Sequence, residues 1–212
     1  MKQIILVGAG GHAAELRDYI NDYNCANEIE RGLTVLGYLD DNRANYDHYD
    51  FAEPYLGNLH DHQIRTDIWY LMGIANLAYR RKIILDFEQM GAKFTGFIHP
   101  TSRISPSATI GRGVVISHSA SIGPKVIVEN HTIINSRTTV GHDTHIGKYN
   151  FISPLCALSG NTKIGDCNLI GTNVITIPGV AIGNENKIGA GVVLFFDVES
   201  GQTIVGNKPR IL

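Results

Sequence analysis

The hydrophobic positions in the second half of the chain recur at every sixth residue. From Ile98 to Leu194, sixteen of the seventeen residues in this register are aliphatic, and no insertion interrupts the spacing. Such a period matches neither an α-helix, which repeats every 3.6 residues, nor a β-strand, which repeats every 2. It indicates a parallel β-helix built from hexapeptides. The register consists of Ile98, Ile104, Ile110, Ile116, Ile122, Val128, Ile134, Val140, Ile146, Ile152, Leu158, Ile164, Ile170, Thr176, Ile182, Ile188 and Leu194.

The residues around each aliphatic position fit the same structure. A small or β-branched residue usually stands two positions earlier, and a glycine such as Gly141 or Gly165 often follows directly. We expect these glycines to supply the turn geometry of the corners. With three sides to a coil, residues 18 apart stack at a spacing of roughly 4.8 Å. The stretch then forms about five coils that bury a continuous core. Thr176, the exception, predicts a local bulge or a side-chain exchange.

The first part of the chain has a different pattern, in which strands and helices alternate. Such alternation predicts an α/β domain with a small parallel, Rossmann-like sheet. We expect strands at 1–7, 34–39, 68–74 and 94–98, and helices near 13–23 and 76–90. The segment 42–67 predicts an irregular connection with one short strand. The sequence therefore divides into a β-α domain over residues 1–97 and a β-helix over residues 98–212.

A glycine-rich turn follows the first predicted strand, with the sequence Gly8-Ala9-Gly10-Gly11-His12. Together with Ala13 it satisfies a dinucleotide fingerprint, but the domain is short and has no second mononucleotide half. A single nucleoside diphosphate at this turn is better supported, because the exposed N–H groups of a helix start bind phosphate. A tight strand-to-helix turn without a ligand is the remaining alternative.

Composition sets further limits. The 212 residues carry a formal net charge of −2, which gives no bulk attraction to nucleic acid or to an anionic membrane. The three cysteines, Cys25, Cys156 and Cys167, do not form the pattern of a disulfide scaffold. The apolar run from Ile4 to Val7 is too short for a signal peptide. We expect a cytoplasmic protein.

Several motifs, each weak alone, together resemble one family. They are the glycine turn, Leu39-Asp40-Asp41, Gly73-Ile74-Ala75-Asn76, Arg80-Arg81-Lys82 and Ile98-His99-Pro100. In this order they resemble the sugar O-/N-acyltransferases, which include sialic-acid O-acetyltransferases and PglD-type nucleotide-amino-sugar N-acetyltransferases. The resemblance covers essentially the whole chain. It implies a left-handed β-helix, a homotrimer, and acetyl-CoA bound in the groove between adjacent prisms.

The resemblance also assigns the catalytic residues. The stretch from Asn135 to Asp143 matches the family's motif of an asparagine, a histidine and an acid. His142 would act as general base, a task that suits an imidazole because its pKa lies near neutrality. Asp143 would orient the ring, and Asn135 would reach the sugar. Gly160, one coil after His142, is the position whose N–H the family uses to polarise the thioester carbonyl. A solvated corner residue is the alternative interpretation of His142.

Binding residues are expected at both ends of the chain. Gly10, Gly11 and His12 would contact the nucleotide sugar, and Asp40 and Asp41 would contact the nucleoside. Capping of turns is an equally good interpretation of the two aspartates. At the other end, the family's closing coils hold the adenine and phosphates of CoA. The residues that correspond to them are Ala190, Lys208 and Arg210. The two cations could equally be solvated tail charges.

No metal is expected, although carbonic anhydrases of the γ class use a similar prism to hold zinc. The candidate ligands His118, His131, His142 and His145 are never 18 or 36 residues apart, so no two of them stack. His145 is expected to be a surface group. PglD-type relatives carry a second histidine nine residues after the catalytic one, where this chain has Phe151.

The sequence thus predicts an acetyl-CoA-dependent N-acetyltransferase that acts on a nucleotide-linked amino sugar. A UDP-4-amino-4,6-dideoxy sugar is the preferred substrate, with direct transfer because no Cys or Ser is suitably placed beside His142. O-acetylation of a sialic acid or another sugar is the alternative within this class. A non-catalytic scaffold and a zinc protein are the alternatives outside it.

Overall fold

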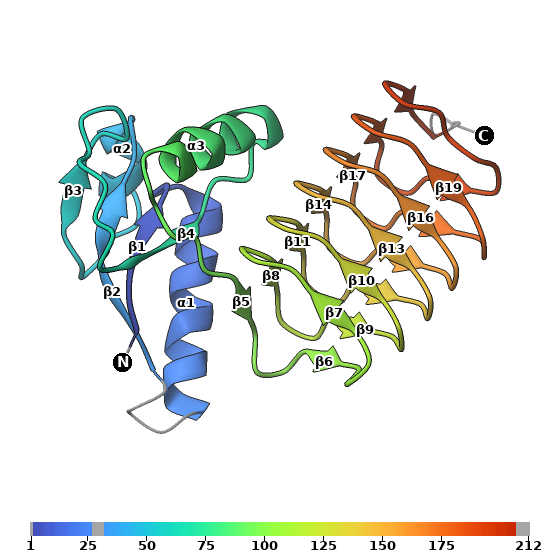
Figure 1. Cartoon of the computed structure of the whole chain (residues 1–212), viewed down its shortest axis with the longest axis horizontal. Helices are drawn as coiled ribbons and strands as arrows, with labels where there is room; N and C mark the ends of the chain where they lie inside the picture. The colour runs from blue at the N-terminus through green and yellow to red at the C-terminus, as the bar shows by residue number, and fades with distance from the viewer. Residues whose placement is uncertain (1, 27–31, 207–212) are drawn as a thin grey trace, which may run out of the picture. The chain divides into compact units, whose positions relative to one another are not determined.

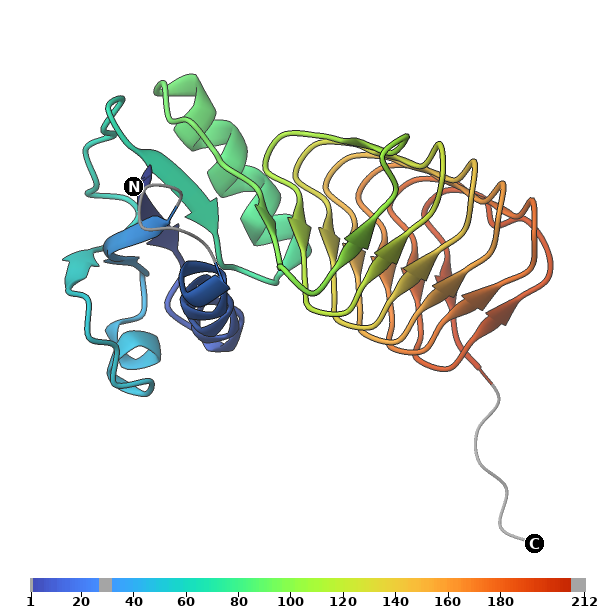
Figure 2. The ribbon, with the colours of Figure 1, turned by 90° about the horizontal axis from the view of Figure 1, so that it is seen from below.

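The computed structural model describes residues 2–26 and 32–206. The chain divides into two compact units, Met1–Pro100 and Thr101–Leu212. The first is a small α/β unit and the second a left-handed parallel β-helix (Figures 1 and 2), so the predicted fold class is confirmed. None of the helices formed by the described residues is long and apolar enough to cross a membrane.

The first unit contains a parallel sheet in the order β3-β2-β1-β4. All four predicted strands and both predicted helices have a counterpart, although the strand expected at 94–98 covers only Phe97–Ile98. The short strand expected within 42–67 is Tyr55–Gly57. The structure adds a short helix, α2, in the segment expected to be irregular, where the side chain of Asn42 caps it by accepting from the N–H of Ala44. The elements are β1 (Lys2–Val7), α1 (Gly11–Ala26), β2 (Leu33–Leu39), α2 (Arg43–Asp47), β3 (Tyr55–Gly57), β4 (Trp69–Met72), α3 (Leu77–Gln89) and β5 (Phe97–Ile98).

The topology of this sheet creates a crevice at one point. From β1 the chain passes through α1 to β2 on one side, whereas β4 pairs with β1 on the other side. The loops that follow β1 and β4 therefore lead apart at the carboxyl ends of two neighbouring strands. Ligands of open parallel sheets bind at such a switch point.

The second unit consists of short strands that form the three faces of a prism, and the strands within each face run parallel (Figure 1). We name each face after the strand that it carries in the coil containing residue 142. The β12 face holds β6 (Arg103–Ile104), β9 (Ser121–Ile122), β12 (Thr139–Val140), β15 (Ala157–Leu158), β18 (Ile175–Thr176) and β21 (Val193–Leu194). The β13 face holds β7 (Thr109–Ile110), β10 (Ile127–Val128), β13 (His145–Ile146), β16 (Lys163–Ile164) and β19 (Ala181–Ile182). The β14 face includes β8 (Val115–Ile116), β11 (Ile133–Ile134), β14 (Phe151–Ile152), β17 (Leu169–Ile170), β20 (Lys187–Ile188) and β22 (Thr203–Ile204).

Strand pairing follows the predicted spacing of 18 residues. Val128 pairs with Ile146, and Ile146 pairs with Ile164, so the sixth-residue row lies on one line along each face. From Ile116 to Leu194, every member of the row is buried, and the aliphatic members form the core of the prism. The hydrophobic row is thus the inner wall of the β-helix.

The glycines that follow the row have a different purpose from the one predicted. Residues with positive φ do recur every sixth position, but they stand three residues after the row, as at Arg137, Asp143 and Tyr149. The glycines directly after the row are not among them. A Cβ built on Gly141 would lie 2.4 Å from the backbone nitrogen of Gly160 in the next coil. The prediction that these glycines supply turn geometry is therefore wrong, because they are required for the close approach of successive coils.

This close approach can be tested at Gly171. A Cβ there would lie 2.7 Å from backbone atoms of both Ile188 and Ala190, so Gly171→Ala should lower the free energy of unfolding by about 1–3 kcal/mol. Gly189→Ala is the matched control in the last coil, where the nearest atom to the new Cβ would be 3.2 Å away. Urea denaturation at equal protein concentration measures both. Equal stability of the two variants would contradict the explanation.

Candidate functional site

One edge of the prism carries an unusual series of residues. Where the chain passes from the β12 face to the β13 face, successive coils place Pro106, Pro124, His142, Gly160 and Pro178 at equivalent positions, each 18 residues apart. Proline has no N–H, so the fold does not need a backbone donor at this position. His142 and Gly160 are the two replacements, and they lie in adjacent coils. This series was visible in the sequence but was not used in the prediction.

His142 forms a hydrogen-bonded pair with the next residue. Its Nδ1 lies 2.8 Å from Oδ2 of Asp143, and both side chains are exposed. Asp143 is one of the residues with positive φ, at 56°. When Nδ1–H donates this hydrogen bond to the carboxylate, the neutral ring keeps the lone pair of Nε2 available as a base.

Gly160 lies directly against this ring. A Cβ built on Gly160 would be 2.8 Å from both Cε1 and Nε2 of His142, so only glycine leaves the ring its observed place. The N–H of Asn161 donates to the His142 carbonyl at 2.9 Å and ties the two coils together. The N–H of Gly160 donates to no acceptor among residues 2–26 and 32–206. A base and an open N–H donor are thus side by side.

Asn135 and Ala190 lie elsewhere on the prism. Both are at the edge where the β14 face passes to the β12 face. Asn135 is buried, and its Nδ2 donates to the carbonyl of Ile152 at 2.8 Å. Within one prism, the structure therefore does not place Asn135 or Ala190 on the edge that carries His142 and Gly160. Their binding roles remain predictions.

The other histidines are dispersed. Nε2 of His145 lies 2.9 Å from Oε1 of Glu129 on the exposed β13 face, and His131 stacks on Tyr149 with ring centroids 5.4 Å apart. Phe151 is half-buried on the β14 face and therefore lies on another side of the prism from His142. Among the described residues, no group of three or more His, Cys, Asp or Glu side chains could hold a metal ion.

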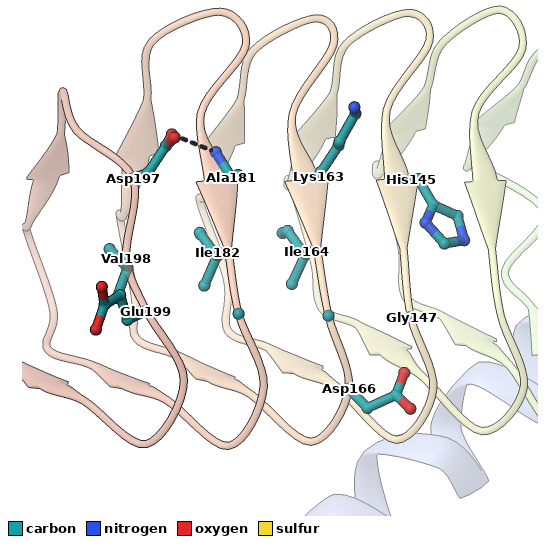
Figure 3. A pocket seen from close by; sticks show the side chains of 12 residues that line it. His145, Gly147, Lys163, Ile164, Asp166, Ala181, Ile182, Asp197, Val198 and Glu199 are labelled. Carbon is teal, nitrogen blue, oxygen red and sulfur yellow. Dashed lines mark hydrogen bonds between the residues drawn. The ribbon is translucent and has the colours of Figure 1, made fainter.

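A groove of about 400 Å³ runs along the β13 face beside His145 (Figure 3). Its charged lining includes Lys163 but also the carboxylates of Asp166, Asp197 and Glu199. In Figure 3, Asp197 points toward Ala181, whose N–H it accepts at 2.8 Å. Three carboxylates against one lysine disfavour the phosphates of CoA, so we do not assign the cofactor's nucleotide to this groove.

In the first unit, a cleft of about 240 Å³ opens at the switch point of the sheet. It is lined by the predicted residues Gly10, Gly11, His12 and Asp40, and by the loop that follows β4. A Cβ on Gly10 would meet nothing within 4 Å, so the backbone of this residue is open to a ligand. Gly11 begins α1, which directs its first N–H groups into this region.

The other positions of the glycine fingerprint have structural explanations. Gly8 has a φ of +105°, which requires glycine at the turn. A Cβ on Gly73 would lie 2.9 Å from the Cβ of Ala13, so helix α1 packs directly on the end of β4. Part of the fingerprint therefore serves the turn and the close packing of helix α1 on β4, and not a ligand.

The capping interpretation describes the contacts of both aspartates. Asp40 is buried, and its carboxylate accepts from the N–H groups of Ala9 and Asn42 at 2.7 and 2.9 Å. Asp41 accepts from the N–H of Leu59 and from the hydroxyl of Tyr79. That hydrogen bond to Asp41 raises the pKa of Tyr79 to about 12, so the phenol stays protonated at neutral pH. Contact of the aspartates with a nucleoside remains a prediction.

Lys208 and Arg210, predicted to bind CoA phosphates, lie outside the described residues.

Comparison with known proteins gives a consistent result. Residues 3–87 match the family described as the PglD N-terminal domain. UDP-N-acetylbacillosamine N-acetyltransferase from Bacillus subtilis (strain 168) is 28% identical over 121 residues, which are 55% of this chain and 51% of that protein. The chain thus spans about half the length of the curated relative that it matches.

Solved structures cover the whole chain. The acetyltransferase domain of PglB from Neisseria gonorrhoeae is 27% identical over 100% of both chains, with a TM-score of 0.83. The same domain has been solved in complex with acetyl coenzyme A. PerB from Caulobacter crescentus, in complex with CoA and GDP-perosamine, is 22% identical over 96% of this chain and 93% of its own, with a TM-score of 0.78. At that identity it supports the fold alone. The predicted resemblance to these acetyltransferases is confirmed.

The role of Asp40 in holding the glycine turn can be tested by Asp40→Asn. The amide cannot accept from all the donors around the carboxylate, so the free energy of unfolding should fall by about 1–3 kcal/mol. Asp47→Asn removes an exposed carboxylate that pairs with Arg43, and should change stability by no more than about 0.5 kcal/mol. Chemical denaturation measures both. A fully stable Asp40→Asn variant would show that the turn does not depend on this carboxylate.

Proposed function

We propose that the chain is an acetyl-CoA-dependent N-acetyltransferase that acts on a nucleotide-linked amino sugar, preferably a UDP-4-amino-4,6-dideoxy sugar. The observation that carries this proposal is the contact between the His142 ring and Gly160, whose N–H is open. With Asp143 on Nδ1, this edge offers a base and an oxyanion donor at equivalent positions of adjacent coils.

In the proposed reaction, the sugar amine attacks the carbonyl carbon of the acetyl thioester. Nε2 of His142 takes the proton that the amine loses, and the N–H of Gly160 stabilises the negative charge on the carbonyl oxygen. The C–S bond then breaks, an amide forms, and the imidazolium returns its proton to the CoA sulfur. Asp143 stabilises the charged ring in between.

Transfer without an acyl-enzyme follows from the neighbouring side chains. The hydroxyl next to Gly160 in the sequence, that of Ser159, donates to the carbonyl of Thr176 at 2.5 Å. Cys156 is buried, and this burial raises the pKa of its thiol. Neither group is an activated nucleophile, so we infer that both substrates must be bound together.

The cleft at the switch point is the proposed nucleotide site. The open backbone of Gly10 and the start of helix α1 suit a pyrophosphate, and His12 lines the same cleft. Tyr79 and Asn45 line it too and can hydrogen-bond a base or ribose. The name of the curated relative favours UDP, whereas the PerB complex contains GDP-perosamine.

A homotrimer is proposed from the outer side of the β12 face. Ala157 pairs with Ile175, and Ile175 pairs with Val193, so their outward side chains form an apolar stripe. Ile175 and Val193 are 37% and 48% exposed, and Ile177 and Phe195 extend the exposed apolar surface. A second prism against this stripe would create the groove in which acetyl-CoA binds, with Gly160 and Ala190 at the two edges of the face. We place the reaction in the cytoplasm, where acetyl-CoA is available.

The catalytic role of His142 can be tested by substitution. His142→Ala should lower kcat for acetyl transfer to a UDP-4-amino-4,6-dideoxy sugar by about 10²–10⁴-fold, because the general base is lost. Release of CoA thiol measures the rate. Stability of the product to mild alkali distinguishes an amide from an ester.

His145→Ala is the matched control, since His145 is an exposed histidine on the adjacent strand, and it should retain wild-type kcat. Unchanged transfer by His142→Ala would contradict the mechanism. An alkali-labile product would replace N- by O-acetylation.

The proposed trimer interface predicts the effect of charge on the apolar stripe. The double variant Ile175→Glu, Val193→Glu should reduce the molar mass in light scattering from three chains to one, because carboxylates would be buried at the contact. Lys187→Glu, which changes the charge of an outward residue on the β14 face, is the control and should remain trimeric. A wild-type monomer, or a trimer that survives the double change, would refute this interface.

A further inference from the structure

Three of the buried polar side chains of the prism, all of them threonines, surround one peptide. At the edge that carries His142, the inward row just before the β13 face reads Ala108, Val126, Thr144, Thr162 and Val180. Of its two threonines, Thr162 lies in the same corner as the Ser159–Gly160 peptide, and Thr144 lies one coil earlier. Thr176, the only non-aliphatic member of the sixth-residue row, lies in the next coil below the same peptide. All three threonines are buried.

Their hydroxyl groups form a chain that ends on this peptide. Thr162 Oγ1 donates to the Ser159 carbonyl at 2.7 Å, and Thr144 Oγ1 donates to the same oxygen at 3.2 Å. Thr176 Oγ1 lies 3.0 Å from Thr162 Oγ1. Because the Thr162 proton is directed to the carbonyl, Thr176 must be the donor in the hydroxyl pair. Thr176 Oγ1 in turn accepts the N–H of Ser159 at 2.9 Å.

The side chain of Thr176 also alters the backbone ladder. In the preceding coil, the N–H of Gly141 donates to the Leu158 carbonyl at 2.7 Å. At the equivalent position, the N–H of Ser159 binds the Thr176 side chain, and the Ser159 hydroxyl occupies the Thr176 carbonyl at 2.5 Å. The peptide after Ser159 is therefore held by side chains. The predicted bulge or side-chain exchange is wrong, because Thr176 itself is buried and pairs in register with Leu194. Ile175 and Ile177 stay exposed.

The direction of the Gly160 N–H follows from these bonds. A trans peptide is planar, and its C=O and N–H point in opposite directions. Since the Ser159 carbonyl points inward to two buried hydroxyls, the N–H of Gly160 points outward from the prism. Hydrogen bonds to the carbonyl also polarise the amide, which makes its N–H a stronger donor.

A comparison within the same prism separates this arrangement from ordinary stabilisation. Thr132 is also buried, donates to the Gly147 carbonyl at 2.7 Å and accepts the N–H of Asn150 at 3.1 Å. There, however, the N–H of the same peptide, that of Lys148, donates to Asp166 at 2.7 Å. The Gly160 N–H donates to no comparable acceptor among the described residues.

We propose that Thr144, Thr162 and Thr176 are positioning residues that aim and polarise the Gly160 N–H toward the acetyl carbonyl. This inference rests on the proposed acetyl transfer, and the three side chains contact no substrate in it. They act through the Ser159–Gly160 peptide. Thr176 takes the place of an apolar residue in the core, and its hydroxyl fixes the peptide that carries this donor.

The test compares Thr176→Val and Thr162→Val with Thr132→Val. Each change removes one buried hydroxyl and keeps the side-chain shape. The two variants at the site should lower kcat by about 10–100-fold, because the oxyanion donor is misaligned. The KM for the nucleotide sugar and the pH dependence set by His142 should be unchanged. Thr176→Ser, which restores the hydroxyl, should recover kcat, and Thr132→Val should retain it at a comparable loss of Tm.

The amide resonance of Gly160 provides a readout that is independent of turnover. Its ¹H shift should move upfield in Thr176→Val and Thr162→Val, and should stay in place in Thr132→Val. Wild-type kcat in Thr176→Val, or an equal loss of kcat in Thr132→Val, would overturn the inference. If the wild type transfers no acetyl group, the proposed function fails. In that case the Gly160 amide shift still tests the positioning role by itself. An unchanged shift in Thr176→Val and Thr162→Val would refute that role.

Discussion

The stacking of each coil on the next, 18 residues later, is the constraint on which the rest of the molecule depends. It requires an inward apolar side chain at every sixth position, and it requires glycines such as Gly141 where backbones nearly touch. Because strand pairs such as Val140 and Leu158 stay in this register, the corners also align along each edge. A residue at a corner therefore has a fixed neighbour one coil away. No long loop is needed to bring two functional groups together.

The proposed chemistry uses this alignment at a single edge. Among the five corners from position 106 to position 178, proline occupies three, and the other two carry His142 and Gly160. Glycine leaves room for the imidazole, while Asp143, in its left-handed conformation, reaches the other ring nitrogen. Buried threonines behind the edge hold the peptide from inside. In the α/β unit, too, small residues permit a close approach: Gly73 and Ala13 let helix α1 pack against the sheet beside the open turn at Gly10.

The β-helix could be predicted almost entirely from sequence, because a period of six is a direct consequence of its geometry. His142 and Gly160 followed from the family resemblance and the register together. The purpose of the glycine row could not be foreseen, since it depends on distances between successive coils. Capping by Asp40 was one of two interpretations, but its bond to Ala9, 31 residues away, requires the fold. Thr176 marked an irregularity, but its hydrogen bonds to Ser159 require atomic positions. Helix α2 was missed because five residues are too few to show periodicity.

A crystal structure of the full chain with acetyl-CoA bound tests the central claim most directly. The account predicts that the thioester carbonyl oxygen lies about 2.7–3.1 Å from the backbone nitrogen of Gly160, on the side that faces Nε2 of His142. Acetyl-CoA bound with its thioester at another edge of the prism, or with its carbonyl directed away from Gly160, would contradict the account.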